Sequence, residues 1–281
     1  MIKQVCVAGA GTMGSGIALN AAQFGYNAIL FDVNESVLQK AKHSNEKILQ
    51  SAVEKGKMKE QEKENTLSRI LYINEINQCK ADLIIEAIVE RIDIKTSLFK
   101  QLAYINSEHC ILASNTSSLS INALQKEINH PGRFAGLHFF NPAHLMKLVE
   151  VVRGENTKEE TIESLVNFCL SLKKVPVVCK DAPGFIVNRV ARHYYLEAMR
   201  LVEAGHASIE TVDALMENAG FKMGPFRLMD LIGNDINLAV SQSLYDAFDQ
   251  EPRFQPNILQ KNLVQKGELG KKTGKGFYSY T

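Results

Sequence analysis

The sequence lacks an excess of charge of either sign. Its 281 residues carry 32 Lys and Arg against 31 Asp and Glu, which gives a net charge of +1. A general nucleic-acid-binding protein would more often carry a basic surplus, because its phosphate contacts come from lysine and arginine. We therefore expect no nucleic-acid partner.

Long apolar runs are missing as well. No stretch approaches the roughly 18–20 apolar residues of a membrane-spanning helix, so we expect no membrane partner. The first residues, MIKQVCVAGAGTMGSG, pass directly into glycines without the cationic flank and apolar core of a signal peptide. These absences predict a soluble, cytoplasmic protein.

Cysteine is scarce and follows no metal or redox pattern. The five cysteines form no CxxC pair, and four of them lie in apolar runs, which favours buried reduced thiols over a disulfide or a metal site. Hydrophobic residues make up 45% of the chain, enough for a large core, and the length suggests two domains. We therefore expect two domains and no metal.

The first two thirds of the chain alternate between strand and helix patterns. Short apolar runs typical of strands stand at 4–10, 28–31, 82–88, 110–113, 134–139 and 147–152. Helical patterns occupy 12–25 and 93–105, and a charged helical hairpin, interrupted at Gly56, is predicted within 36–69. This alternation predicts an α/β domain over residues 1–182, with a Rossmann-type doubly wound, largely parallel sheet.

The pattern changes in the last third. Helices are predicted from Pro183 to Gly205, over 209–220 and from near Leu228, and no clear strand precedes the tail. Residues 183–281 are therefore expected to form an all-helical C-terminal domain.

A glycine-rich turn, VAGAGTMGSG, links the first predicted strand to the first helix. Gly9, Gly11 and Gly14 form G-x-G-x-x-G, which permits a tight turn and lets backbone and helix N-terminus approach a pyrophosphate. The next strand ends in Asp32, whose carboxylate can bind both adenosine ribose hydroxyls and repels a 2′-phosphate. The context predicts NAD rather than NADP; the alternatives are a flavin and a glycine turn without a ligand.

Two ionisable side chains interrupt the apolar segment RFAGLHFFNPAHLMKLVEVV. His138 and Glu150 each stand between two apolar neighbours, and burying either without a partner would be unfavourable. A turn at 141–142 can bring the second strand back beside the first, so that the two side chains pair. Histidine ordinarily titrates at about 6.5, close to neutrality, so a histidine held in this way could act as a general base. Either residue alone is more often structural.

Further motifs follow the glycine turn in a fixed order. They are ASNTSSL (113–119), GLHFFNPAHLMKLVEVV (136–152), KDAPGFIVNRV (180–190), MGPFRLMDLIG (223–233) and GKKTGKGFYSY (270–280). With them the chain resembles the L-3-hydroxyacyl-CoA dehydrogenases, particularly the bacterial 3-hydroxybutyryl-CoA dehydrogenases, over essentially its whole length. The resemblance implies NAD-dependent interconversion of 3-hydroxyacyl-CoA and 3-ketoacyl-CoA thioesters of short chain length, and a homodimer formed through the helical domain.

The resemblance also implies roles for individual residues. His138 would be the catalytic base and Glu150 its partner, while Ser117 and Asn188 would contact the substrate. The cofactor site would comprise Gly9, Ala10, Gly11, Thr12, Met13, Gly14, Asp32, Glu90, Lys95, Ser117 and Asn141.

Two segments allow more than one interpretation. In VEKGKMKEQEK (53–63), Lys55 or Lys57 would meet the 3′-phosphate of CoA, although Glu54 and Gly56 depart from the lysine-richer family pattern; the segment could instead be a solvated hairpin. The SNTSS segment could cap the next helix through Ser118 or Ser120 while Ser117 faces the site. His144, in the same loop as the catalytic motif, is expected to be exposed.

Two other functions are compatible with part of the pattern. A related dehydrogenase of a sugar acid such as L-gulonate would keep the glycine turn and the histidine, and the lysines of the hairpin favour a CoA substrate over it. A non-catalytic dinucleotide-binding protein would not need Ser117, His138, Glu150 and Asn188, all of which are present.

Overall fold

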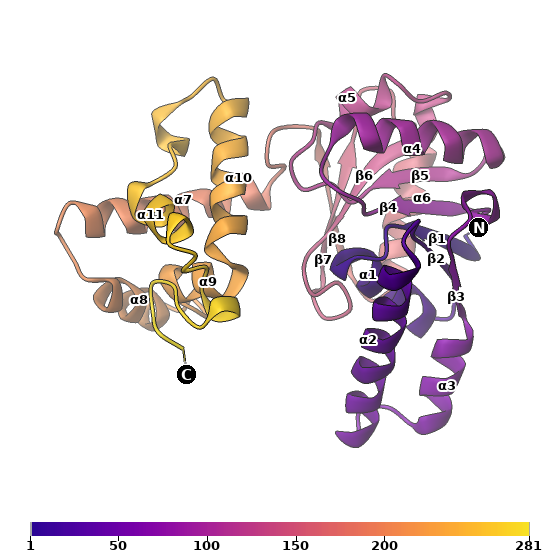
Figure 1. Cartoon of the computed structure of the whole chain (residues 1–281). Coiled ribbons are helices and arrows are strands. Elements are labelled where there is room, and N and C mark those ends of the chain that lie inside the picture. The colour runs from indigo at the N-terminus through magenta and orange to yellow at the C-terminus, as the bar shows by residue number, and fades with distance from the viewer. Residues whose placement is uncertain (1, 281) are drawn as a thin grey trace. The chain divides into compact units, whose positions relative to one another are not determined.

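The computed structural model describes residues 2–280 and divides into two compact units, one ending at Asp181 and the other beginning at Ala182 (Figure 1). The strands all belong to the first unit: β1 (Gln4–Ala8), β2 (Asn27–Phe31), β3 (Ile70–Ile73), β4 (Leu83–Glu86), β5 (Ile111–Ser114), β6 (Phe134–Phe139), β7 (Leu148–Arg153) and β8 (Val175–Lys180). Its helices are α1 (Thr12–Gln23), α2 (Glu35–Glu54), α3 (Glu60–Ser68), α4 (Ile92–Ile105), α5 (Ile121–Gln125) and α6 (Glu159–Ser171).

The eight strands form one sheet in the order β3-β2-β1-β4-β5-β6-β7-β8. The strands from β1 to β6 pair in parallel, β7 is antiparallel to β6, and β8 is parallel to β7. Chain order reverses between β1 and β4, which is the kind of switch point where open α/β sheets bind ligands. The Rossmann-type prediction is confirmed, whereas β3 and β8 were not predicted as strands.

Helices cover both faces of the sheet because its central strands are apolar on both sides. On one face α1 and α6 pack against β1 and β6–β8, and Tyr26, just after α1, meets Phe168 of α6 edge to face. On the other face Phe99 of α4 meets Phe134 of β6 in the same way, with ring centroids 4.9 Å apart. The site described below lies at the strand ends between these layers.

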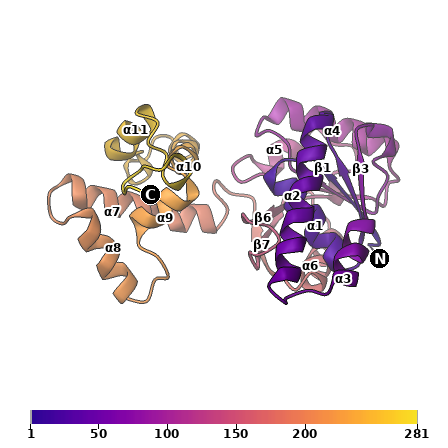
Figure 2. The same ribbon diagram turned by 60° about the horizontal axis from the view of Figure 1, so that its bottom comes forward.

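The charged segment after Asp32 forms the predicted helical hairpin, α2 and α3, which extends from the sheet beyond α1 (Figures 1 and 2). Asn34 caps α2 by accepting a hydrogen bond from the Ser36 N–H, 3.0 Å away. Leu38, Ala41 and Leu49 lie buried at helical spacing, so one stripe of α2 packs while the rest stays solvated. Gly56 ends the helix with φ +65°, as its predicted break requires.

The second unit is helical, as predicted. It contains α7 (Val187–Glu203), α8 (Ile209–Asn218), α9 (Pro225–Ile232), α10 (Asn234–Ala247) and α11 (Ile258–Gln265), and within residues 182–280 the only β pairing is a set of isolated bridges in the tail. Buried Asp230 of α9 fixes that tail by accepting hydrogen bonds from the Phe277 and Tyr278 N–H groups, 3.0 and 2.9 Å away.

Candidate active site

The glycine turn adopts the geometry that its sequence predicts. Gly9 has φ +108°, a conformation that side chains disfavour, and a Cβ there would collide with the Ala87 carbonyl group. A Cβ on Gly14 would overlap the Gly9 carbonyl oxygen, so this position too must be glycine for α1 to approach β1. Gly11 precedes α1 without a side-chain cap, which leaves the first N–H groups of the helix for a phosphate.

Asp32 ends β2 beside this turn. Its carboxylate accepts one hydrogen bond from the Ala10 N–H and another from the Asn34 N–H, each 2.9 Å long. These two bonds fix the carboxylate beside a cavity of 770 Å³, which is lined by Gly9, Gly11, apolar side chains that follow β2 and β4, and side chains of α4. A cavity of this size that combines apolar walls with the Asp32 carboxylate fits an adenosine group.

His138 and Glu150 are brought together by the pairing of β6 and β7. They stand directly opposite each other in the antiparallel register, so both side chains lie on the same face. The His138 Nδ1 atom lies 2.8 Å from the Glu150 Oε2 atom, and both residues are buried, at 6% and 1% exposure. The contact predicted from the sequence is therefore present, and it is made through the Nδ1 atom of the imidazole ring.

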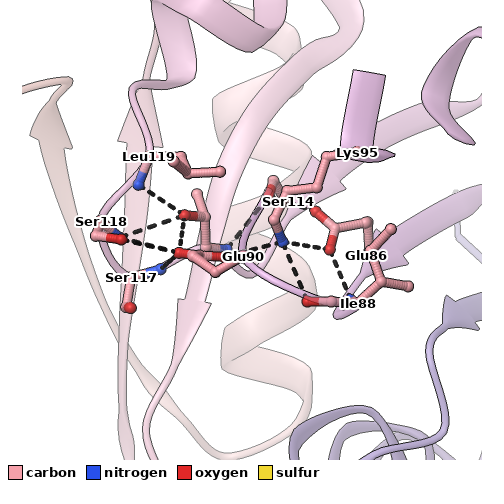
Figure 3. Close-up of polar contacts among 9 residues, drawn as sticks. Glu86, Ile88, Glu90, Lys95, Ser114, Ser117, Ser118 and Leu119 are labelled. Carbon is pink, nitrogen blue, oxygen red and sulfur yellow. Dashed lines mark hydrogen bonds and ion pairs between the residues drawn. The ribbon is translucent and has the colours of Figure 1, made fainter. Parts of the chain in front are cut away.

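Ser117 lies in a turn that follows β5, and Glu90 organises this turn (Figure 3). One carboxylate oxygen, Glu90 Oε1, accepts hydrogen bonds from the N–H groups of Ser117 and Ser118 at 3.0 and 3.3 Å, and from the Thr116 hydroxyl at 2.5 Å. Burial tends to raise the pKa of Glu90, but the Lys95 charge and these donors outweigh burial and lower it. Ser120 caps α5 through the Ala123 N–H, as one of the predicted alternatives had it.

Lys95 is buried between two carboxylates. Its Nζ atom lies 2.5 Å from Glu86 Oε1 and 3.1 Å from Glu90 Oε2, and it also reaches the Ile88 carbonyl oxygen at 3.4 Å. These three contacts use the three N–H donors of the ammonium group. In this arrangement Lys95 would act on a cofactor through Glu90 rather than by direct contact.

The remaining predicted residues occupy separate places. Asn141 is exposed at the start of the loop between β6 and β7, and Asn188 stands in the first turn of α7 in the second unit. Lys55 and Lys57 are exposed at the tip of the α2–α3 hairpin, and Thr12 and Met13 open α1. Nothing in these positions conflicts with the predicted roles, which stay predictions.

The expectation that His144 is exposed was wrong. The side chain is half-buried, and burial, assisted by the nearby Lys174 charge, lowers its pKa. Lys174 is itself buried and donates to the carbonyl oxygens of Ala143 and Met146, at 2.6 and 2.8 Å. These bonds hold the loop that contains His144 against the start of β8, a contact that the loop sequence alone does not indicate.

Two contacts near the site were not anticipated from the sequence. Glu86 and Ser114 form a hydrogen bond of 2.7 Å at the ends of β4 and β5, and the Asn115 side chain accepts from the Phe139 N–H at 2.8 Å. Glu86 carried a usable signal: it is an acid within the apolar run DLIIEAI, as Glu150 is within KLVEVV. The contacts of Asn115 and Ser114 join segments that are distant in the sequence, and no local sequence pattern indicated them.

Metal and membrane features are absent within residues 2–280. No cluster of three or more His, Cys, Asp or Glu side chains there could hold a metal ion, and no helix is long and apolar enough to cross a bilayer. All five cysteines are free thiols; four are buried and Cys179 is half-buried.

The switch-point sheet, the glycine turn with Asp32 and the buried histidine–carboxylate pair define a dinucleotide-binding protein of the dehydrogenase class. Residues 4–182 match the family model of the 3-hydroxyacyl-CoA dehydrogenase NAD binding domain, and residues 184–280 match that of the 3-hydroxyacyl-CoA dehydrogenase C-terminal domain. The chain belongs to the 3-hydroxyacyl-CoA dehydrogenase family.

Relatives match this chain along its whole length. The 3-hydroxyadipyl-CoA dehydrogenase of Escherichia coli (strain K12) is 48% identical over 99% of this chain, which spans only 59% of that protein. The mitochondrial hydroxyacyl-coenzyme A dehydrogenase of Sus scrofa is 46% identical, with 100% of this chain and 92% of that protein covered. The crystal structure of (S)-3-hydroxybutyryl-CoA dehydrogenase from Ralstonia eutropha superposes with a TM-score of 0.95 at 38% identity and covers 100% of both chains.

Proposed function

We propose that the protein interconverts (S)-3-hydroxyacyl-CoA and 3-ketoacyl-CoA with NAD, acting on short chains such as 3-hydroxybutyryl-CoA and acetoacetyl-CoA. The observation that carries the proposal is the 2.8 Å contact between buried His138 and Glu150, in the same domain as the glycine turn. The similarity to a (S)-3-hydroxybutyryl-CoA dehydrogenase over the full length of both chains supports the short-chain substrate.

In this proposal His138 removes the proton of the 3-hydroxyl group through Nε2 while the carbon loses a hydride. The bound NAD supplies the acceptor for that hydride. Glu150 orients the imidazole ring through Nδ1 and stabilises the imidazolium that forms. Ser117 hydrogen-bonds the substrate oxygen, and in the reverse direction His138 returns the proton to it.

The proposal is tested by following nicotinamide absorbance with candidate substrates. NADH offered with acetoacetyl-CoA should be oxidised with higher kcat/KM than with longer 3-ketoacyl-CoAs, and NAD offered with L-gulonate should give no reduction. Turnover of gulonate in place of acetoacetyl-CoA would assign the protein to sugar-acid oxidation. Binding of NADH without turnover of any of these substrates would favour a non-catalytic role.

We also propose a homodimer formed through the second unit, in the cytoplasm. Large apolar side chains are exposed on that unit, among them Val190 and Leu215, at 68% and 64% exposure. Where exposed apolar side chains gather into one patch, that patch often marks an association surface. Light scattering at micromolar concentration should give twice the mass of the chain.

Asp32 should make the enzyme prefer NADH to NADPH, because its carboxylate would repel a 2′-phosphate. Replacing Asp32 with Asn keeps an oxygen that can accept the Ala10 N–H but removes the charge. We expect the NADH-to-NADPH ratio of kcat/KM to fall about 10-fold or more in this variant. If the unaltered protein uses both cofactors with equal efficiency, the role of Asp32 is wrong.

Lys55 and Lys57 should attract the 3′-phosphate of CoA. Changing both to Ala should raise the KM for acetoacetyl-CoA a few-fold at low salt, since exposed charge pairs contribute only about 0.2–1 kcal/mol each. The KM for a thioester that lacks the nucleotide should not change. As a matched control, changing exposed Lys40 and Lys42 of α2 to Ala removes the same charge far from the hairpin tip and should leave the KM unaltered. An unchanged KM in the Lys55 and Lys57 variant would remove this assignment.

A further inference from the structure

The ends of β1, β4 and β5 meet at Glu86, a fully buried carboxyl group outside the His138–Glu150 pair. In the parallel register Glu86 stands beside Ala8 on one side and Ser114 on the other. Its carboxyl group accepts hydrogen bonds from Lys95 Nζ at 2.5 Å, the Ser114 hydroxyl at 2.7 Å and the Ile88 N–H at 2.7 Å. In all three contacts the Glu86 oxygens are the acceptors, as expected of an ionised carboxylate that forms an ion pair with Lys95.

Two routes lead from Glu86 to the turn that carries Ser117 (Figure 3). The first passes through Lys95 to Glu90, whose carboxylate binds the N–H groups of Ser117 and Ser118. The second passes through the Ser114 hydroxyl, which accepts a hydrogen bond from the Thr116 N–H at 3.3 Å. Both routes therefore end on the backbone of residues 116–118.

The network binds the backbone of this turn, and the Ser117 side chain points away from the network. In Figure 3 the Ser117 N–H faces Glu90, whereas its hydroxyl oxygen points away from that carboxylate. Removing a charge from the buried end of the network would leave Lys95 undercompensated and displace Glu90, because a buried ion pair is strongly perturbed when one partner is lost. Glu90 is the more exposed end of the network, at 37% side-chain exposure, and its ion pair with Lys95 would pass a displacement of Lys95 on to the turn.

We propose that Glu86 is a positioning residue: through Lys95 and Glu90, and through Ser114, it fixes the turn that places the Ser117 hydroxyl against the substrate oxygen. This proposal rests on the proposed function, because it needs Ser117 to touch the substrate. The proposal explains why the apolar strand β4 contains an acid, Glu86, that takes no part in the reaction itself.

The test compares Glu86→Gln and Lys95→Met with Lys100→Met. Lys100 lies five positions along the same helix from Lys95 and pairs with Glu127 at 2.9 Å, with both side chains about half-exposed. With acetoacetyl-CoA and NADH, kcat should fall about 10- to 100-fold in the first two variants, as for a reacting geometry displaced by a fraction of an ångström to one ångström. It should stay unchanged in Lys100→Met. If Glu86→Gln does not fold, the double variant Glu86→Gln/Lys95→Met removes both buried charges together and takes its place.

Hydrogen exchange of the backbone amides of residues 115–119 shows directly whether the turn has loosened. It needs no substrate, so it distinguishes a displaced turn from a loss of activity with another cause. The Ser117 and Ser118 amides should exchange about 10-fold faster or more in the Glu86 and Lys95 variants than in the unaltered protein. Folded variants in which neither kcat nor this exchange changes would overturn the proposal, as would a loss of kcat without faster exchange. An unaltered protein inactive with every 3-ketoacyl-CoA would refute the proposed function instead, and exchange would still decide whether Glu86 holds the turn.

Discussion

Replacing His138 with Gln is expected to lower kcat about 100- to 10,000-fold, the usual worth of general acid–base help from a positioned side chain. Gln fills a similar space and can hydrogen-bond, but it cannot take the proton that the hydroxyl group must lose. Cofactor binding depends on the glycine turn and Asp32, so the Kd for NADH should stay within about 3-fold of the unaltered value. Steady-state kinetics and NADH fluorescence titration measure the two quantities.

A second histidine in the following loop provides the matched control. His144 is half-buried beside Lys174, and among residues 2–280 no carboxylate pairs with it as Glu150 pairs with His138. His144→Gln makes the same chemical change six positions along the chain and should leave kcat nearly unaltered. Comparable losses of kcat in both variants would show that the loop, rather than the His138 imidazole, limits the reaction.

Replacing Glu150 with Gln is expected to lower kcat by about 100-fold or more, because the reaction loses the charge that stabilises the imidazolium. Gln preserves the shape of the buried side chain, so the variant should fold, which a thermal unfolding curve would confirm. Glu159→Gln is the control. It neutralises an exposed carboxylate of α6, which pairs at 2.8 Å with Arg153 at the end of β7, the strand that carries Glu150. Equal activity of Glu150→Gln and the unaltered protein would contradict the assigned role.

The parts of the site that follow from local sequence were predictable. The glycine turn is set by short-range sterics, since Gly9 needs a positive φ and Gly14 needs room beside the Gly9 carbonyl group. The His138–Glu150 contact follows from an antiparallel hairpin, in which residues opposite each other face the same side. The helical hairpin was visible because the apolar stripe of α2 has helical spacing.

The parts that depend on contacts between distant segments were not predictable in the same way. The strands β3 and β8 lie at the two edges of the sheet. Only two residues of β3 are buried, and β8 contains Pro176, so neither carries a clear strand pattern. The partly buried position of His144 depends on Lys174, thirty residues further along the chain. The Glu86–Lys95–Glu90 network joins β4, its following loop and α4, and only the folded sheet shows that it ends at the Ser117 turn.

The central claim, that His138 and Glu150 act as one catalytic unit, is tested most directly by a double-mutant cycle on kcat. The unaltered protein, His138→Gln, Glu150→Gln and the double variant are compared with acetoacetyl-CoA and NADH at one pH, after thermal unfolding has shown all four to be folded. Because Glu150 works only through the imidazole, the double variant should be little slower than His138→Gln alone. If the losses of the two single variants instead multiply in the double variant, the two side chains act independently, and the account of this pair given above is wrong.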